Sequence, residues 1–236
     1  MAMQKHMNDI GAQRSKKRPR RESNRAGAST RERLLKTAVE MFARHGFAET
    51  SLREITESAD ANIAAINYHF GSKEGLYEAV LDRIFRPVLE ERLARLERLE
   101  TEAMENGGEW DVDALLRSWI EPMLDRYFAG GAEGAQILDL EAQISGALQE
   151  GRMTEWPRPY IEYTRRFRLT MTRAVRHLRA EDVAWRVEVL CASALPLLTG
   201  GAALEDNTGG LCSAADRERF LSGWMSVARA LLLPPS

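Results

Sequence analysis

Residues 62–73, with the sequence NIAAINYHFGSK, gather polar side chains whose chemistry suits contact with another molecule. Asn67 carries a hydrogen-bond donor and an acceptor side by side, the pair that the exposed edge of adenine requires. Tyr68 and His69 can donate hydrogen bonds to phosphate oxygens on either side of a groove. These residue types favour recognition of a nucleic acid over catalysis.

Small and charged residues around this cluster fit the same interpretation. Ala64 and Ala65 would allow a helix to approach base edges in a major groove, where a methyl group can touch a thymine methyl. The stretch is interrupted at Gly71 and Ser72, and a new helix is expected to start there. Its N-terminal amides, together with Lys73, are expected to face a phosphate.

Two short helices joined by a tight turn are needed to position these residues. In the first helix, Thr50 or Ser51 is the expected N-cap, and Glu54 follows Ser51 at the spacing of a capping box. Asp60 stands where the chain must turn sharply, since Asp tolerates left-handed backbone geometry better than most residues. Asn62 is expected to cap the second helix.

A third helix must pack across this pair. The segment 29–46 has a helical apolar period, with an N-cap expected at Ser29 or Thr30 and a left-handed end at Gly46. Its apolar stripe consists of Leu34, Leu35, Ala38, Val39 and Phe42. The expected inward face of the second short helix consists of Ile63, Ile66 and Phe70. Three such helices form a helix-turn-helix unit, which places its second short helix in the major groove.

Residues 30–81 resemble the DNA-binding domain of TetR-family transcriptional repressors. The resemblance rests on the motifs AVEMFARHGFAETS and YHFGSKEGL. The sequence departs from the family pattern at Met41, where Leu is common, and at Asp60, where Gly is usual. IAAIN is also a less common recognition segment. The stretch NIAAINYHFGSKEGL is similar to the subgroup with a longer C-terminal domain that includes CecR-like regulators.

The candidate DNA contacts of this module are Thr50, Ser51, Asn62, Ala64, Ala65, Asn67, Tyr68, His69 and Lys73. A net charge of −2 hides a basic N-terminus, because residues 1–31 contain nine Lys or Arg and only two acidic residues. Residues 1–28 lack apolar periodicity and are predicted to form a disordered arm. Arg18, Arg20 and Arg21 of this arm are expected to favour the negative potential of a narrow minor groove. The alternative is a solvated tail.

The remaining organisation is predicted to be helical throughout. Residues 29–75 would form the helix-turn-helix domain, and residues 76–236 a larger helical bundle for ligand binding and dimerisation. The segments of the bundle are helical in period and bounded by turn-forming residues, and no strand alternation stands out. Pro87 is expected to kink or end the first of these helices, and EDNTGG, residues 205–210, is expected to be a loop. The predicted fold class is all-α.

By the resemblance, the bundle holds an effector pocket and a dimer interface. Aromatic and sulfur side chains suit a pocket between helices; the candidates are Trp119, Met123, Tyr127, Trp156, Tyr160 and Phe167. TetR-like proteins dimerise through two C-terminal helices of each subunit, where the candidates are Val187, Leu190, Ala194, Leu198, Leu221, Trp224, Met225 and Ala228. For both sets the alternative is an ordinary core. A symmetric dimer also suits a palindromic operator.

Enzymatic functions find no support in the sequence, which lacks hydrolase, metalloprotease, P-loop and dinucleotide motifs. Asp139 and Glu141 do not face each other on a helix, and Cys191, Cys212 and isolated histidines do not make a metal site. No cofactor is expected. The 44% hydrophobic and 29% charged composition is that of a globular protein. No apolar run approaches the length of a membrane span, and the N-terminus lacks a signal-peptide core, so a cytoplasmic location is expected.

The sequence thus predicts a ligand-responsive dimeric repressor. It would bind a palindromic operator on double-stranded DNA and would be released by a small-molecule effector. Two alternatives stay open. The effector could instead promote DNA binding, or the chain could be a helical interaction protein that acts through its C-terminal bundle.

Overall fold

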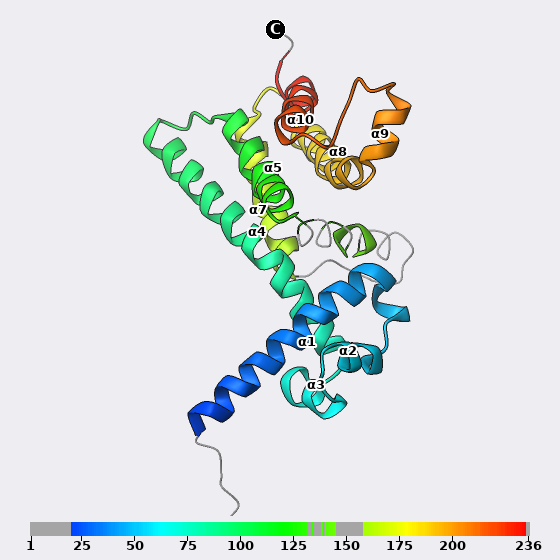
Figure 1. Cartoon of the computed structure of the whole chain (residues 1–236). Helices are drawn as coiled ribbons and strands as arrows, with labels where there is room; N and C mark the ends of the chain where they lie inside the picture. Colours follow the sequence, from blue (N-terminus) through cyan, green and yellow to red (C-terminus); the bar gives the residue numbers. More distant parts are fainter. Residues whose placement is uncertain (1–19, 132–133, 135–137, 139, 145–157, 235–236) are drawn as a thin grey trace, which may run out of the picture.

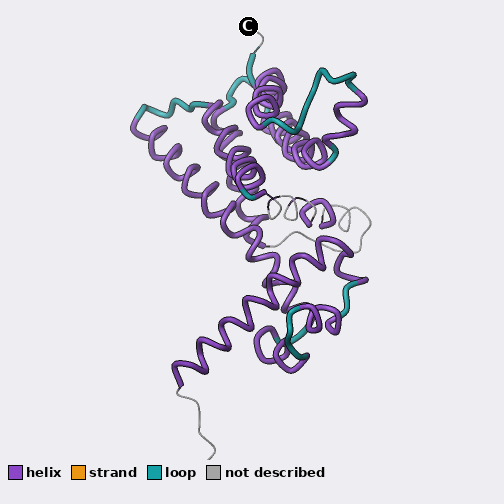
Figure 2. Tube along the Cα trace, viewed as in Figure 1, coloured by secondary structure: helices purple, strands orange, loops and turns teal. Residues whose placement is uncertain are grey.

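The computed structural model describes residues 20–131, 134, 138, 140–144 and 158–234, with side chains from residue 28 onward. The regular elements in these ranges are helices joined by turns (Figures 1 and 2). They are α1 (Arg20–Glu49), α2 (Leu52–Ser58), α3 (Ile63–Phe70), α4 (Lys73–Glu105), α5 (Val112–Ala129), a short helical segment at 140–144, α7 (Arg158–Ala174), α8 (Ala180–Thr199), α9 (Gly201–Asn207) and α10 (Arg217–Leu232). The predicted all-α fold class is confirmed.

An N-terminal module is built from α1, α2 and α3, which pack on one another and on the start of α4. Its centre consists of side chains with no exposed surface: Leu34 and Phe42 of α1, Ile55 of α2, Ile66 of α3 and Leu76 of α4. Burying each side chain of this size contributes about 1.5–3 kcal/mol. The module is therefore held by a small apolar core to which every one of its helices contributes.

The first helix differs from the prediction at its start. It begins at Arg20, so the predicted arm, which was placed up to residue 28, is shorter in the structure. The segment RRESNRAGAS has no apolar face, but its Arg, Glu and Ala residues have high helix propensity and extend the helix N-terminally. The helix bends where a break was predicted: Gly46 has φ 76° and ψ 171°, a combination that is essentially confined to glycine.

The helix α4 joins the two halves of the molecule, as Figure 1 shows. Its 33 residues span about 50 Å, and it packs on α1 and α3 near its start and on α5 and α7 further along. Pro87 lies inside it, and the helix continues past this residue. The expectation that Pro87 could end the helix is therefore wrong.

The C-terminal bundle contains α5, α7, α8 and α10 alongside the second half of α4. Trp119 of α5 and Trp224 of α10 stack with ring centroids 5.7 Å apart, which joins these two helices. The predicted loop at residues 205–210 is only partly a loop, because its first three residues belong to α9. The run AALEDN contains good helix formers and adds this extra turn.

Among the described residues, no single helix is long and apolar enough to cross a bilayer. The helices α8 and α9 reach that length and hydropathy only when they are counted together, and they meet at a 94° bend.

The geometry of Gly46 yields a stability prediction. A Cβ at this position would lie 3.2 Å from Oε1 of Gln143 and would force a non-glycine residue into its glycine-only conformation. We expect Gly46→Ala to lower the free energy of unfolding by about 1–3 kcal/mol, measured by urea denaturation. Gly107→Ala is the control, since its φ is 70° but a Cβ there meets nothing within 4 Å. A loss at Gly46 no greater than that at Gly107 would contradict this account.

Candidate nucleic-acid interface

The tight turn between α2 and α3 is fixed by its backbone and by one arginine. Asp60 has φ 47°, so the predicted left-handed geometry at this residue is confirmed. Arg33 of α1 donates from Nε to the carbonyl of Ala59 (3.1 Å) and from Nη2 to the carbonyl of Asp60 (3.2 Å). These bonds tie the turn to α1. Sequence reasoning missed this role, because a helical arginine carries no signal of a partner that lies 26 residues away.

Both short helices have the predicted N-caps. The Ser51 hydroxyl accepts from the amide of Glu54, while the Glu54 carboxylate accepts from the Ser51 amide at 2.9 Å. Those hydrogen bonds from the amide and hydroxyl of Ser51 hold the pKa of Glu54 below its usual value. Asn62 Oδ1 accepts from the amide of Ala65 at 2.9 Å. The side chains of Ser51 and Asn62 are therefore exposed but already engaged in capping.

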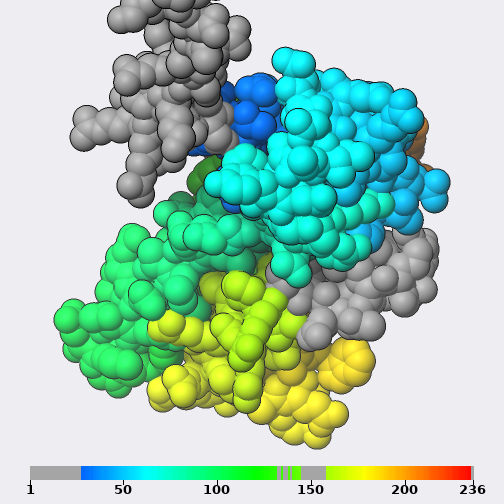
Figure 3. Space-filling view, turned by 90° about the horizontal axis from the view of Figure 1, so that it is seen from below, coloured from blue at the N-terminus to red at the C-terminus, as the bar shows by residue number. Residues whose placement is uncertain are grey.

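The outer face of α3 is formed by residues one turn apart. Ala64, Asn67 and Tyr68 are exposed there, with Tyr68 exposed over 85% of its surface. Ile63 is 47% exposed and joins the same face, so its predicted inward position is wrong. The N-cap places Ile63 in the first turn, before α3 reaches the core, and Ile66 alone fills the buried position. In Figure 3, the cyan residues of this part of the chain form an open surface at the end of the molecule.

Ala65 and His69 lie at the edge of this face and are half-buried. The His69 ring contacts the ring of Tyr68 edge-on at a centroid distance of 4.9 Å and that of Phe70 at 6.1 Å. These contacts restrict where Tyr68 and His69 can point. The two side chains therefore form an ordered pair at the C-terminal end of α3.

Thr50 does not belong to the exposed surface. Its side chain is 1% exposed, and its hydroxyl donates to the carbonyl of Gly46 at 2.8 Å and to that of Met41 at 3.2 Å. The prediction of a DNA contact at Thr50 is therefore corrected. Its hydroxyl bonds to two carbonyls of α1 and so stabilises the bend between α1 and α2. The neighbouring cap residue, Ser51, remains at the surface.

Lys73 is held by the module itself. Its ammonium donates to the carbonyl of Ala48 at 3.3 Å and lies 4.6 Å from the ring centroid of Phe47. The start of α4 is capped by Ser72, and the pKa of Glu74 is lowered by hydrogen bonds from its own backbone amide and from the Ser72 hydroxyl. An anion arriving at this helix end would meet a carboxylate already there. A phosphate contact at Lys73 stays a prediction.

Two further cations flank α3 that sequence reasoning did not select. The exposed Arg31 guanidinium lies 5.1 Å from the ring centroid of Phe70. Arg53 of α2 pairs with Glu57 at 2.8 Å, and both side chains are largely exposed, so this pair adds little stability. Arg18 lies outside the described residues, and for Arg20 and Arg21 only their place in the backbone of α1 is described.

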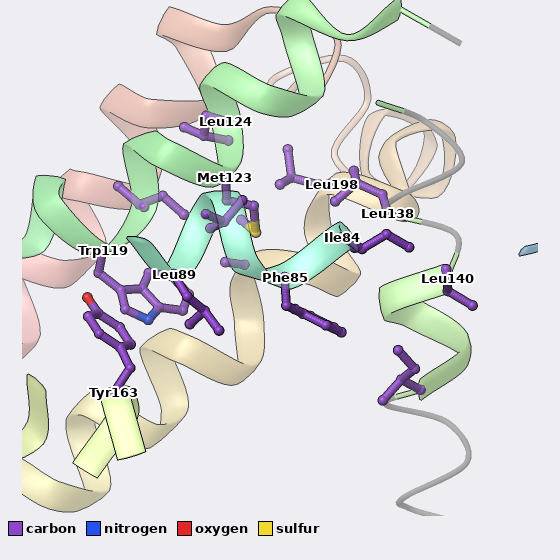
Figure 4. Close-up of a cluster of buried hydrophobic side chains, with 14 of the residues drawn as sticks. Ile84, Phe85, Leu89, Trp119, Met123, Leu124, Leu138, Leu140, Tyr163 and Leu198 are labelled. Atoms are coloured by element: carbon purple, nitrogen blue, oxygen red, sulfur yellow. The ribbon is translucent and has the colours of Figure 1, made fainter. Parts of the chain in front are cut away.

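A separate cavity of about 440 Å³ lies inside the C-terminal bundle, between α4, α5, α7, α8 and the segment 140–144. Four predicted pocket residues line it: Trp119, Met123, Tyr160 and Phe167. Tyr127 lies outside it, and Trp156 is outside the described residues. Figure 4 shows Phe85, Leu89, Trp119 and Met123 in this region, with the Tyr163 ring beside the Trp119 indole.

Two buried charged residues also line the cavity, and sequence reasoning missed both as pocket residues. Arg92 is 3% exposed; its Nε donates to the carbonyl of Trp119 at 2.7 Å and its guanidinium lies 4.6 Å from that residue's ring centroid. Glu141 is 7% exposed. Burial raises its pKa to about 7, against the opposing attraction of Arg92 and Arg126. The signal available in the sequence was Arg92 itself, an arginine at an inward position of the helical period.

The predicted interface residues of α8 and α10 face the interior of the chain. All eight, Val187, Leu190, Ala194, Leu198, Leu221, Trp224, Met225 and Ala228, are buried within one subunit. The prediction is therefore corrected. The eight predicted residues fill the core of one subunit, and a different face of α8 and α10 is exposed. Val189 and Val227 are each 56% exposed on that face, next to Leu197 and Gly223.

Comparison with known proteins agrees with this architecture. Residues 34–80 match the family described as bacterial regulatory proteins, tetR family, and residues 117–230 match the tetracyclin repressor-like C-terminal domain. The chain is 41% identical over 56 residues to the HTH-type transcriptional repressor NicS of Pseudomonas putida, spanning 24% of this chain and 26% of NicS. It is 42% identical over 72 residues to the HTH-type transcriptional dual regulator CecR of Shigella flexneri, spanning 28% of this chain and 32% of CecR.

The chain thus spans about a quarter to a third of the length of the curated relatives that it matches. The CecR-like subgroup stays a prediction. Among solved structures, the TetR-family transcriptional regulator SCO4454 of Streptomyces coelicolor aligns with a TM-score of 0.52 at 20% identity, covering 87% of this chain and 95% of that one. This likeness concerns the fold. Both domain matches together show that the chain belongs to the TetR family of bacterial transcriptional regulators.

Proposed function

We propose that this protein is a dimeric repressor that binds operator DNA through α2 and α3 and is released by a small molecule bound in the bundle cavity. The observation that carries the proposal is the outer face of α3, where Ile63, Ala64, Asn67 and Tyr68 are exposed together. This face combines apolar contact for thymine methyls with an amide for adenine. The caps at Ser51 and Asn62 hold both helix ends in place without using the residues of that face.

Contacts to the DNA backbone would come from residues around α3. Tyr68 and His69 can donate to phosphates, and the exposed Arg31 adds a positive charge beside them. The basic segment before α1 would add counterion release and, through Arg18, Arg20 and Arg21, minor-groove contacts. A cytoplasmic location, where a DNA-binding regulator meets its operator, is part of the proposal.

The dimer would form through the outer faces of α8 and α10. Between these helices and α9 lies a hollow of about 520 Å³ whose lining is mostly apolar; it includes Val189, Leu197, Leu204, Leu211 and Val227. Leu211 is 80% exposed in the free chain. An apolar surface of this kind is typical of an interaction site, and a second copy would present the same surface by two-fold symmetry.

Two other functions are less well supported. A helical interaction protein acting only through its bundle would not require an exposed, polar α3 face and a turn fixed by Arg33. An effector that promotes DNA binding differs from the proposal only in sign. Measuring operator affinity with and without the bound molecule separates these two cases.

Base reading by α3 can be tested at Asn67. We expect Asn67→Ala to lose the preference for one base pair in each half-site, at a cost of about 1–3 kcal/mol in discrimination. The consensus is obtained by selecting binding sites from random double-stranded DNA, and affinities are measured by fluorescence anisotropy. Asn106→Ala, at the far end of α4, is the matched control. An unchanged consensus for Asn67→Ala would remove this residue from the reading set.

Assembly can be tested at Val227. A charge at the centre of an apolar interface costs free energy only in the dimer, so Val227→Asp should sediment as a folded monomer at concentrations where the wild type is a dimer. The same variant should bind a palindromic operator more weakly. Leu169→Asp is the control, because Leu169 is equally exposed, at 54%, but lies on α7. A dimer that persists in Val227→Asp places the interface elsewhere.

A further inference from the structure

Two of the hollows of the bundle differ in how their charged residues are paired. An open groove of about 770 Å³ runs between α4 and α7, and it contains two close ion pairs: Arg86 with Asp82 at 2.6 Å, and Arg158 with Glu162 at 3.0 Å. The cavity of about 440 Å³ also contains charged residues. In the described part of the chain, its Arg92 and Glu141 form no ion pair within 4 Å.

Arg92 is a buried cation with unused hydrogen-bonding capacity. Its Nε donates to the Trp119 carbonyl, and its two terminal amino groups make no hydrogen bond with any described residue. The guanidinium lies 4.6 Å from the ring centroid of Trp119 and 5.9 Å from that of Tyr163. Both distances are within the range of cation–π attraction. A buried guanidinium with a free fork matches the two oxygens of a carboxylate.

The surroundings of Arg92 contain donors without acceptors. Nε1 of Trp119 and the hydroxyl of Tyr163 are buried and have no hydrogen-bond partner among the described residues. Leaving such groups unsatisfied costs free energy. Glu141 is a nearby acceptor, but burial raises its pKa, so its negative charge is disfavoured there. The surroundings of Arg92 therefore have an excess of positive charge and of hydrogen-bond donors.

We propose that the bundle cavity binds an apolar organic acid, with its carboxylate on the free fork of Arg92. The body of the acid would lie among Phe85, Leu89, Met123 and Phe167, which line the same cavity. This proposal rests on the proposed function, since it names the chemical class of the molecule that fills the effector site. A neutral apolar molecule would leave Arg92 unpaired, and an organic cation would be repelled by it.

Proton binding follows from the position of Glu141. The neighbours of Glu141 are Arg92 from α4, Arg126 from α5 and Tyr160 from α7. At the edge of the cavity, Arg168 and Glu188 pair with each other at 3.1 Å. Burial raises the pKa values of Tyr160 and Cys191 to about 12, so these groups stay protonated between pH 6 and pH 8. The pKa of about 7 places the change in charge of Glu141 within that window.

The sign of the pH dependence is fixed by charge. Below pH 7, Glu141 is mostly protonated and neutral, so a bound carboxylate meets only the cations. Above pH 7, Glu141 carries a negative charge that repels the ligand. The dissociation constant of an organic acid should therefore rise several-fold from pH 6 to pH 8, while that of a matched neutral amide should not change.

The test uses 2-naphthoate, 2-naphthamide and 2-naphthylmethylamine, which share one ring system and differ in charge. Binding to the full chain is measured by isothermal titration calorimetry at pH 6 and pH 8. At pH 6 the naphthoate should bind at least about 10-fold more tightly than the amide, because a hydrogen bond to a charged partner is the difference between them. The assay contains no DNA, so its outcome is independent of whether the chain binds an operator or represses.

Three variants assign the effect to the cavity. Arg92→Met should remove the advantage of naphthoate over the amide, whereas Arg98→Met, on the exposed side of the same helix, should retain it. Glu141→Gln should bind naphthoate with the same affinity at pH 6 and pH 8. If Arg92→Met does not fold, as judged by circular dichroism, Glu141→Gln carries the test. Equal binding of acid and amide by the wild type, or no naphthoate binding at millimolar concentration, would overturn the proposal.

Discussion

Burial of Leu76 and Val80 fastens the long helix α4 to the N-terminal module, and the arrangement of the whole chain depends on this contact. The first turns of α4 complete the core of the module against α1 and α3. Later turns of the same helix carry Leu89 and Arg92, which form one wall of the bundle cavity. One continuous helix is thus shared by the two cores, which links the packing of the two halves.

The segment 140–144 makes a second connection between the two halves. Gln143 donates to the carbonyl of Ala43 in α1 and lies next to the bend at Gly46. Two residues earlier, Glu141 borders the cavity. The two side chains belong to one short helical stretch, so the wall of the cavity and a support of the N-terminal module are parts of the same element. A molecule that displaces Glu141 therefore acts close to α1, the helix whose Arg33 holds the turn before α3.

Local features of this fold could be read from the sequence, and features set by distant partners could not. The bend at Gly46, the left-handed Asp60 and the caps at Ser51 and Asn62 depend on a few neighbouring residues, and the structure has them as predicted. Whether Thr50 is buried depends on the bend that it closes. The same limit applies to the bundle, where periodicity marks the apolar faces of α8 and α10 without saying which residues pack inward.

Charged core residues were the hardest to predict. Arg92 and Glu141 lie far apart in the sequence, and their proximity depends on how α4 and the segment 140–144 pack. A helical wheel of either element alone shows only one charged residue on an otherwise apolar side. The chemistry of the cavity therefore emerged only from the three-dimensional arrangement.

Pro87 gives α4 a mechanical property that its length alone would not. A proline ring lacks the amide that would bond the carbonyl four residues earlier, so the helix is less stiff at this point than along the rest of its length. The point lies in the stretch of α4 that borders the cavity, between Phe85 and Val88, and Lys73 is about 21 Å away along the axis. A bend of about 10° there would carry the start of α4 through about 4 Å by the same helix geometry. That displacement exceeds one base-pair step of about 3.4 Å, so under the proposed function a small angular change within the bundle is enough to take α3 out of register with the bases.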